Sequence, residues 1–565
     1  MSPRATPVQF AVAALIALFL LVFLVVPVIT VIYVAFADGA GGFTLSHFSS
    51  FFHITLMRES FWNSLYVGFW SVLISSLIAI PLAYFTVRFE FRGAVLIQTL
   101  GILPLVMPPF VGAVAMQLIF GRSGGVNLLL NEWFGVTLPI MEGLNGVIFV
   151  EALHYFPFIL MNLVVALNNI DSSMEESAQN LGASGLRLFR RIVFPLAMPG
   201  YVAGAALVFI KVFDDLGTPL VLNQTNLLAP QAYLRITTIG IEDPIGYVAS
   251  VIMVAASLFA LWASTWVMRG KDYATLQRGY AGLAKRRLSA WQTAFAYGWI
   301  VLVLLVVLAP HIGILLLSFA KLWSFSVVPE TYTLAHYATV FQDSPRMIWN
   351  TVLYCGIAAT LDIVIATAIA YIMLRTRIPG RQALDFTVTI ALAIPGVVLG
   401  IGYLRTFRGI EIPFTGELLT SSWLLLVLAY TVRRLPYALR SCIAALQQMH
   451  VSLEEAAENL GANKGRTIRR IVVPLMAGGM LAGFIISFMT AAVELSTTIM
   501  LVTAQNDAPM SYGIYLYLQS AAGRGPGAAL GMLAVLLVAV GTYLSHRLIG
   551  RTGGTQPLEV QKIAV

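Results

Sequence analysis

The chain has 565 residues, of which 59% are hydrophobic and only 11% are charged. An average soluble protein is about 25% charged, so a soluble domain of this composition could not cover its surface with polar side chains. The chain is therefore predicted to be a membrane protein with many spans. Its net charge of +8 would suit a nucleic-acid partner, but the placement of the charges along the chain gives a better explanation.

Twelve apolar stretches are long enough to cross a bilayer, which takes about 20 residues. The first is longer than the usual apolar region of a signal peptide and has no clear cleavage site, so we interpret it as a retained span. The sequence thus predicts an all-α membrane protein with about 12 transmembrane helices. The expected spans are 10–36, 62–87, 95–120, 146–168, 191–213, 246–268, 293–319, 348–374, 384–404, 421–443, 470–493 and 525–547.

The positive charges are distributed unevenly between the two sides of the membrane. If the chain begins in the cytoplasm, 22 of the 34 Lys and Arg residues lie in cytoplasmic segments, and nine lie in outer loops or span ends. This excess follows the positive-inside rule and predicts that both termini face the cytoplasm. It also accounts for the basic balance without nucleic acid.

The two halves of the chain repeat in parallel, because six spans in each half make both halves begin on the same side. Arg88 matches Arg375 and Pro108 matches Pro395 at an offset of 287 residues, which falls to 279 further along. We expect a first half over 1–268, a basic cytoplasmic linker over 269–291, a second half over 292–550 and a cytoplasmic tail over 551–565.

Prolines and glycine pairs recur inside the expected spans. Pro108 and Pro395 each free a backbone carbonyl, which fits a kink beside a pathway or a packing kink. The pairs Gly200 with Gly204 and Gly479 with Gly483 read Gly-x-x-x-Gly, which lets helices approach closely. Ordinary packing and an interface between the halves both fit these glycines.

Motifs for chemistry are missing from the sequence. No Gly-x-x-x-x-Gly-Lys-Ser/Thr loop is present to hold ATP phosphates, and no HExxH or CxxC motif occurs. Cys355 and Cys442 fall in apolar stretches and form no disulfide framework or metal motif. The chain is therefore expected to be a transport subunit without enzyme activity and without a bound cofactor, and the sequence leaves a metal site open.

One short cytoplasmic segment occurs in each half at the offset of 279. It reads Glu175-Glu176-Ser177-Ala178-Gln179-Asn180-Leu181-Gly182 in the first half and Glu454-Glu455-Ala456-Ala457-Glu458-Asn459-Leu460-Gly461 in the second. Ser173 with Glu176 and Ser452 with Glu455 fit capping boxes, and each glycine lies where a helix would stop. Each short helix has an apolar stripe that needs a partner: Met174, Ala178, Leu181 and Leu453, Ala457, Leu460.

The pattern Glu-Ala-Ala, three residues, Gly, nine residues, Ile, two residues, Pro resembles the EAA loop of ABC-importer permeases. The second copy fits it throughout, and the first departs only at Ser177. The alternative is a pair of amphipathic helices on the membrane surface. The resemblance implies a type I ABC-importer permease fold whose loops dock on a cytoplasmic ABC ATPase homodimer. The docking residues it implies are Glu175, Glu176, Ala178, Gly182, Glu454, Glu455, Ala457 and Gly461.

The resemblance also implies the partners and the place of the protein. The implied partners are a solute-binding protein outside and the ATPase subunit, which hydrolyses the ATP. The implied place is the lipid of a bacterial cytoplasmic (inner) membrane, which the chain crosses many times. The fused halves look most like ferric-iron permeases. Similar permeases carry 2-aminoethylphosphonate, thiamine, phosphorylated sugars, polyamines or sulfate. A self-sufficient secondary transporter is the alternative class, although that class favours inverted repeats or coupling-ion sites.

Two groups of charged residues are candidates for the solute pathway. Asp214, Asp215 and Thr218 follow one repeated helix, and Asp215 and Thr218 align with Glu494 and Thr497 after the other. Buried carboxylates at a span end are costly, so they either face each other across a pathway or lie among headgroups. Such a pair suits a cation such as ferric iron.

Arg433 and Arg434 lie near mid-depth in an expected span, where the first half has His154 and Tyr155. A charge at that depth needs a carboxylate partner or water. The arginines therefore either form a structural ion pair, with Glu151 or Glu494, or line the pathway and favour an anion such as a phosphonate.

Overall fold

The computed structural model describes residues 6–268 and 287–552, except for positions 40, 91, 414 and 521. These residues form a bundle of long helices with one small two-stranded sheet, which confirms the predicted all-α membrane fold. The expected linker up to residue 286 and the expected tail beyond residue 552 lie outside the described residues.

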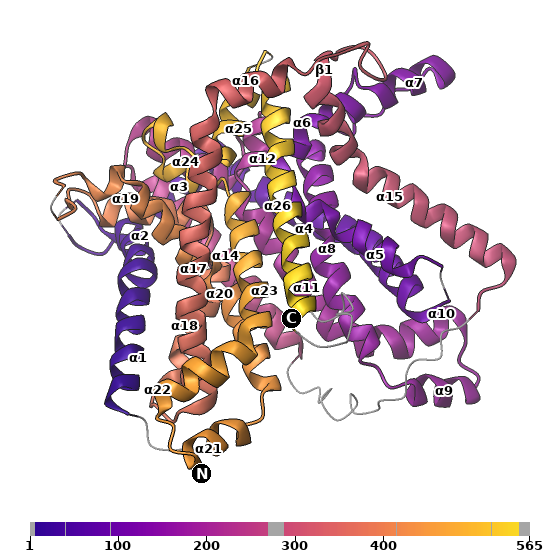
Figure 1. Cartoon of the computed structure of the whole chain (residues 1–565). Coiled ribbons are helices and arrows are strands. Elements are labelled where there is room, and N and C mark those ends of the chain that lie inside the picture. The colour runs from indigo at the N-terminus through magenta and orange to yellow at the C-terminus, as the bar shows by residue number, and fades with distance from the viewer. Residues whose placement is uncertain are drawn as a thin grey trace.

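The helices follow one another in two series (Figure 1). The first half contains α1 (Pro7–Leu20), η1 (Leu21–Val25), α2 (Val26–Phe36), α3 (Ser46–His53), α4 (Thr55–Arg88), α5 (Ala94–Ile102), η2 (Leu103–Val106), α6 (Pro109–Phe120), α7 (Gly125–Phe134), α8 (Leu144–Asn168), α9 (Ser172–Asn180), α10 (Gly185–Leu188), η3 (Phe189–Val193), α11 (Phe194–Asp214), α12 (Gly217–Val221), α13 (Leu228–Leu234), η4 (Arg235–Ile239) and α14 (Pro244–Met268). The second half contains α15 (Ala290–Phe319), β1 (Ala320–Leu322), β2 (Thr331–Tyr332), α16 (Ala335–Asp343), α17 (Pro345–Arg375), α18 (Arg381–Ile390), η6 (Ala391–Ala393), α19 (Gly396–Thr406), η7 (Leu419–Ser421), α20 (Trp423–Gln448), α21 (Ser452–Asn459), α22 (Lys464–Thr467), η8 (Ile468–Val472), α23 (Val473–Ala492), α24 (Thr498–Leu501), η9 (Gln505–Asp507), α25 (Met510–Leu518) and α26 (Arg524–Thr552).

Ten helical segments within the described residues are long and apolar enough to cross a membrane. Nine of them coincide with expected spans. The expected span 421–443 corresponds to α20, which is long enough, but its three arginines make it less apolar than the others.

Two expected spans are broken in the same place in each half, so the prediction that they are continuous is wrong. The stretch 95–120 is divided at Pro108, between Ala94–Val106 and α6. The stretch 384–404 is divided at Pro395, where the helix axis turns by 109° before α19. Proline has no N–H to donate, and its ring clashes with the carbonyl group of the residue four positions earlier, so a continuous helix is interrupted there.

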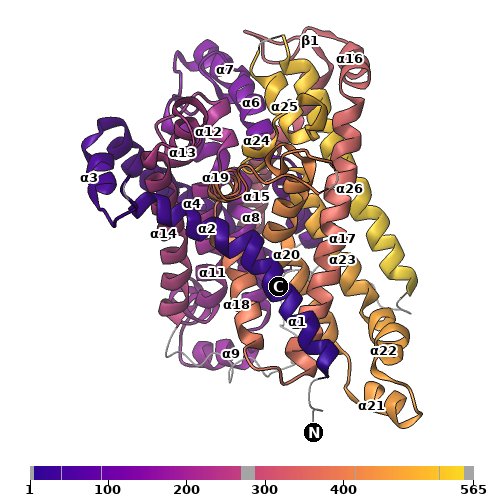
Figure 2. The ribbon, with the colours of Figure 1, turned by 90° about the vertical axis from the view of Figure 1, so that its left-hand side faces the viewer.

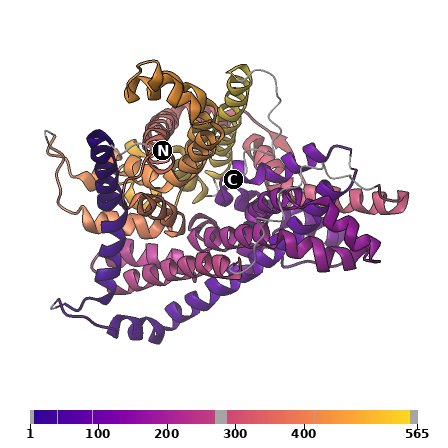
Figure 3. The same cartoon turned by 90° about the horizontal axis from the view of Figure 1, so that it is seen from below.

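The first helix of each half packs against the other half. α2 lies on α19 of the second half, and α15 lies on α6 of the first. Figure 3 shows the indigo α1 beside the orange helices of the second half. As a result, one hydrophobic core contains side chains from both halves, and the two repeats form one unit.

The glycine pairs lie inside each half. A Cβ on Gly204 would approach Ile159 Cα of α8 to 2.7 Å, and one on Gly483 would approach Ala438 Cα of α20 to 3.2 Å. These glycines allow α11 to pack on α8 and α23 on α20. They therefore serve ordinary close packing and do not form the interface between the halves.

The two repeated loops lie at one end of the bundle. Figures 1 and 2 show α9, α21 and the start of α1 at the lower end, and α7, α16 and β1 at the upper end. Parallel repeats require this arrangement, because each half enters the membrane from the same side.

Reporters fused after Arg287 and after Arg551 are expected to report a cytoplasmic location. The physical reason is the excess of Lys and Arg on the side of α9 and α21. A fusion after Glu330, in the segment between β1 and β2 at the opposite end, is the matched control and should report the outside. Alkaline phosphatase and fluorescent-protein activities measure the two outcomes. An outward report at Arg287 or Arg551 would contradict the topology.

Candidate functional site

The two loop helices, α9 and α21, end as their glycines predict. Gly182 and Gly461 have φ angles of +85° and +83°, in the left-handed region that glycine adopts without strain. In each loop the next amide also closes the helix: Ala183 N–H donates to Ala178 O and Ala462 N–H to Ala457 O, each at 2.9 Å. This pattern is a Schellman motif, which satisfies the last carbonyls of the helix.

The predicted capping boxes are wrong. α9 is capped by Asp171, whose Oδ1 accepts from the Ser173 backbone N–H at 2.9 Å. α21 has Val451 at the cap position without a side-chain cap. In the second loop the Ser452 hydroxyl is instead 2.7 Å from Nδ1 of His450. In each loop, a polar side chain two residues earlier, Asp171 or His450, thus accepts from the backbone N–H of the serine that was expected to cap the helix.

Only part of each predicted apolar stripe is buried. Ala178 and Ala457 are buried against the protein. Leu181 and Leu460, at the end of the stripes, are each 89% exposed. Each loop thus presents an almost fully exposed leucine to its surroundings at the same position.

A buried ion pair anchors each loop helix to the end of a long helix. Arg88 at the end of α4 lies 2.6 Å from Glu175, and Arg375 at the end of α17 lies 2.6 Å from Glu454. Arg375 also donates to the carbonyl of Met449 at 2.9 Å. Breaking such a pair is costly, because one charge stays buried without its partner.

These anchors were not predicted, although the sequence contained a signal for them. Arg88 and Arg375 repeat at one offset, and Glu175 and Glu454 repeat at the other. Charged residues that recur together in both halves are candidates for contact. Glu176 and Glu455, the next residues, are exposed and remain free to meet a partner protein.

Arg433 of α20 joins the halves through a second buried ion-pair network. Its guanidinium contacts Asp214 of the first half at 2.6 Å and Glu494 of its own half at 2.5 Å. Nη1 also donates to the Thr497 hydroxyl at 3.0 Å. The other oxygen of Asp214 accepts from the backbone N–H of Gly396, at the break before α19, at 2.5 Å. The network therefore ties α11, α19 and α20 together.

Asp215 and Glu494 have the same local role in their halves. Asp215 Oδ1 accepts from the backbone N–H of Gly217 at 2.9 Å, and its Oδ2 accepts from the Thr218 hydroxyl at 2.5 Å. Glu494 Oε1 accepts from the backbone N–H of Thr497 at 2.9 Å. Each carboxylate thus caps the short helix that follows it, α12 or α24, at the positive end.

Beside Asp215 and Glu494, the contact between the halves is made by a neighbouring residue. The residue of the first half that crosses to the second is Asp214, through Arg433. The hydrogen-bond donors to Asp215 described above all belong to its own half. Arg434 is buried on α20, where its charge acts on the buried carboxyl of Asp362 in α17.

A second ion-paired link between the halves is more exposed than the Arg433 network. Glu242, before α14, is 2.6 Å from Arg405 of α19 and 2.5 Å from Arg408. Hydrogen bonds from these two guanidinium groups hold the pKa of Glu242 below its ordinary value. The glutamate is well exposed, so solvent screens this link and it contributes little to stability.

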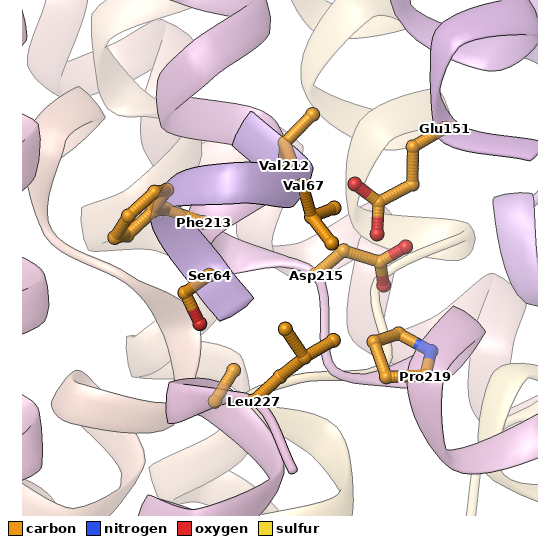
Figure 4. Close-up of a pocket in the computed structure, with 9 residues that line it drawn as sticks. Ser64, Val67, Glu151, Val212, Phe213, Asp215, Pro219 and Leu227 are labelled. Atoms are coloured by element: carbon orange, nitrogen blue, oxygen red, sulfur yellow. The ribbon is translucent and has the colours of Figure 1, made fainter. Parts of the chain in front are cut away.

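A small pocket lies beside Asp215 in the first half (Figure 4). Its polar wall consists of Glu151 of α8, Asp215 and Ser64 of α4, and apolar side chains close the rest. Its volume of about 10 Å³ is close to what one water molecule needs. Within the described residues, no group of three or more His, Cys, Asp and Glu side chains could hold a metal ion.

The sequence model of one protein family matches both halves. The family is described as "Binding-protein-dependent transport system inner membrane component", and the matched residues are 75–273 and 362–552. The two matches contain both broken helices, both loop helices and the Arg433 network.

The chain is also similar to individual transport proteins. It is 30% identical over 463 residues to the ferric transport system permease protein FbpB of Actinobacillus pleuropneumoniae, which covers 80% of this chain and 65% of that protein. It is 30% identical over 452 residues to the putative ferric transport system permease protein FbpB 1 of Haemophilus influenzae, which covers 78% and 70%. The molybdenum transport system permease protein ModB of Escherichia coli is 30% identical over 211 residues, 36% of this chain and 91% of that protein.

Proposed function

The chain belongs to the family of binding-protein-dependent transport system inner membrane components, and from this premise we propose that it is the transmembrane subunit of an ATP-driven importer. It takes a solute from a binding protein outside and passes it into the cytoplasm. Its place is a bacterial cytoplasmic membrane. Its partners are a homodimeric ABC ATPase, which hydrolyses the ATP, and the solute-binding protein.

The pair of anchored loop helices is the observation that carries this proposal. α9 and α21 lie at one end of the bundle, and each is held by a buried Arg–Glu pair (Figure 1). Each also exposes a leucine, Leu181 or Leu460, that a groove in a partner would bury. Two equivalent loops fit a homodimer, because each ATPase subunit can receive one of them.

We propose ferric iron as the solute. The two ferric transport permeases resemble this chain over about four fifths of its length, including both halves. Buried carboxyl groups outnumber buried guanidinium groups near the ends of α11 and α23, with Asp214, Asp215 and Glu494 around Arg433. Buried carboxylates beside a pathway suit a cation.

An oxyanion such as molybdate is the second candidate, because the molybdenum permease matches one half of the chain. Binding an oxyanion in a fork geometry needs a guanidinium that has free donors. Both terminal nitrogens of Arg433 already bind carboxylates, at 2.6 and 2.5 Å. Arg433 is therefore unavailable to an oxyanion, and Arg434, whose Nε has no hydrogen-bond partner among the described residues, is the guanidinium that would have to bind it.

Uptake of radioactive ferric citrate and of molybdate should separate the two solutes. Cells that express this chain with its ATPase and binding protein are expected to accumulate iron, and cells that lack only this chain are the control. Molybdate uptake without iron uptake would overturn the choice of solute and leave the importer intact. Uptake that persists after loss of the ATPase would instead indicate a secondary transporter and would overturn the importer itself.

A further inference from the structure

The two halves compensate an equivalent buried carboxylate in different ways. In the second half, Glu494 lies against Arg433. The residue that aligns with Arg433 in the first half is His154, so Asp215 has no arginine at the equivalent place. Glu151 of the first half aligns with Tyr430, whose hydroxyl lies 2.6 Å from the Thr498 hydroxyl. The first half thus has an extra acid where the second has a neutral phenol.

Asp215 receives hydrogen bonds of the kind that stabilise an ionised carboxylate. Two backbone N–H groups, of Gly217 and Thr218, point at its Oδ1, and the Thr218 hydroxyl donates to its Oδ2. Donors of this kind stabilise the charged form of a carboxyl group. The positive end of α12 adds to the effect, although that helix is short.

Glu151 lies in the opposite situation. Its side chain is 1% exposed, and within the described part of the chain no donor reaches its Oε2. A buried carboxylate without a donor or a cation is expensive. A neutral carboxylic acid costs much less and can itself donate a hydrogen bond.

Among the residues that the structure describes, the other charged and titratable groups near Glu151 give it no basic partner. The charge that acts on it is the negative charge of Asp215. Its own helix adds Tyr155 and His154, and the latter interacts with His311 of α15. α4 contributes the Ser64 hydroxyl, α11 contributes Lys211, whose charge acts on Asp214, and α5, α6 and α12 contain no charged residue.

Figure 4 shows that the Glu151 and Asp215 side chains point toward each other in the same pocket. We propose that Glu151 is a proton-binding site: it is a neutral carboxylic acid that donates its proton toward the ionised Asp215, directly or through one water. The pair then holds one proton and one negative charge. This site is specific to the first half and does not depend on the identity of the solute.

Infrared spectroscopy of the purified chain at neutral pH tests this site. A neutral carboxylic acid has a C=O stretching band that shifts in D₂O, whereas a carboxylate has none. We expect Glu151→Gln to remove one such band, because the variant has no carboxylic acid at this position. The amide has the shape of the neutral acid, so the packing around it should stay the same. Glu494→Gln is the matched control in the second half, and it should leave the band unchanged because Glu494 is ionised against Arg433.

A second measurement distinguishes a proton from a metal cation. If Glu151 is neutral, Glu151→Gln keeps the midpoint of thermal unfolding, and the wild-type midpoint is the same in sodium chloride, calcium chloride and choline chloride. A midpoint that rises with sodium or calcium in the wild type, and no longer does so in Glu151→Gln, would overturn the proposal in favour of a bound metal ion. An unchanged carboxylic-acid band in Glu151→Gln would overturn it as well.

Discussion

Replacing Arg433 with glutamine is expected to destabilise the folded protein by about 3–5 kcal/mol. The guanidinium is 6% exposed and is the shared partner of Asp214 and Glu494, one from each half. Its loss removes the shared ion-pair partner of two buried carboxylates, and breaking a buried pair on one side only is strongly destabilising. The midpoint of thermal unfolding in detergent, with size-exclusion chromatography to detect the loss of folded protein, measures the change.

Arg440→Gln is the matched control on the same helix. Arg440 is 38% exposed and lies 3.1 Å from Asp385, and an exposed pair of this kind contributes about 0–1 kcal/mol. Neutralising the whole network, with Asp214→Asn and Glu494→Gln added to Arg433→Gln, should restore much of the lost stability. If Arg433→Gln lowers the midpoint no more than Arg440→Gln does, the network does not hold the halves together.

The stability of the Arg433 network also affects transport. A variant that neutralises Arg433 and Arg434 together would lose transport through unfolding, whatever the charge of the solute. The removal of Asp215 has a similar effect on a smaller scale, because Asp215 caps α12. Tests of solute charge therefore belong with uptake of defined ions, and with variants that keep the network neutral as a whole.

The second large effect is expected at the loop anchors. Replacing Glu175 and Glu454 with glutamine should release α9 and α21 from Arg88 and Arg375. Each change removes the carboxylate partner of a buried arginine. If about 3 kcal/mol of this cost falls on the docked loop, affinity for the ATPase drops roughly 100-fold. Co-purification of the ATPase and its solute-stimulated ATP hydrolysis measure the loss.

Glu176→Gln with Glu455→Gln provides the comparison, because these neighbours are exposed. Hydrogen exchange of the loop amides in the permease alone separates anchoring from contact with the ATPase. We expect faster exchange in α9 and α21 for the Glu175 and Glu454 variants and wild-type exchange for the neighbours. Equal exchange in all variants would show that the ion pairs do not hold the loops.

The amino-acid sequence by itself determined the features that depend on neighbouring residues. Hydropathy located nine spans that the helices confirm, because crossing lipid requires a continuous apolar helix. Gly182 and Gly461 marked the ends of the loop helices, since the left-handed conformation is a local property of glycine. The constant offsets between the halves revealed the parallel repeat before any contact was known.

Sequence patterns predicted helix caps and bends less well, because more than one side chain or packing arrangement can satisfy the same pattern. The serines before α9 and α21 fitted capping boxes, but Asp171 and His450 lie close enough to replace them. Pro108 and Pro395 were recognised as kinks, whereas the 109° turn at Pro395 depends on the helices that pack on either side. A proline removes a hydrogen bond, and the tertiary packing decides how far the axis then bends.

Only the tertiary structure decided which buried charges meet. Arg433 is 219 residues from Asp214 and 61 residues from Glu494, and no local pattern favours one partner over the other. Asp215 and Asp214 are adjacent in sequence, yet one caps its own helix and the other crosses to the second half. The reason is that the cost of a buried charge is set by its three-dimensional surroundings, and these exist only once α11, α19 and α20 have packed together.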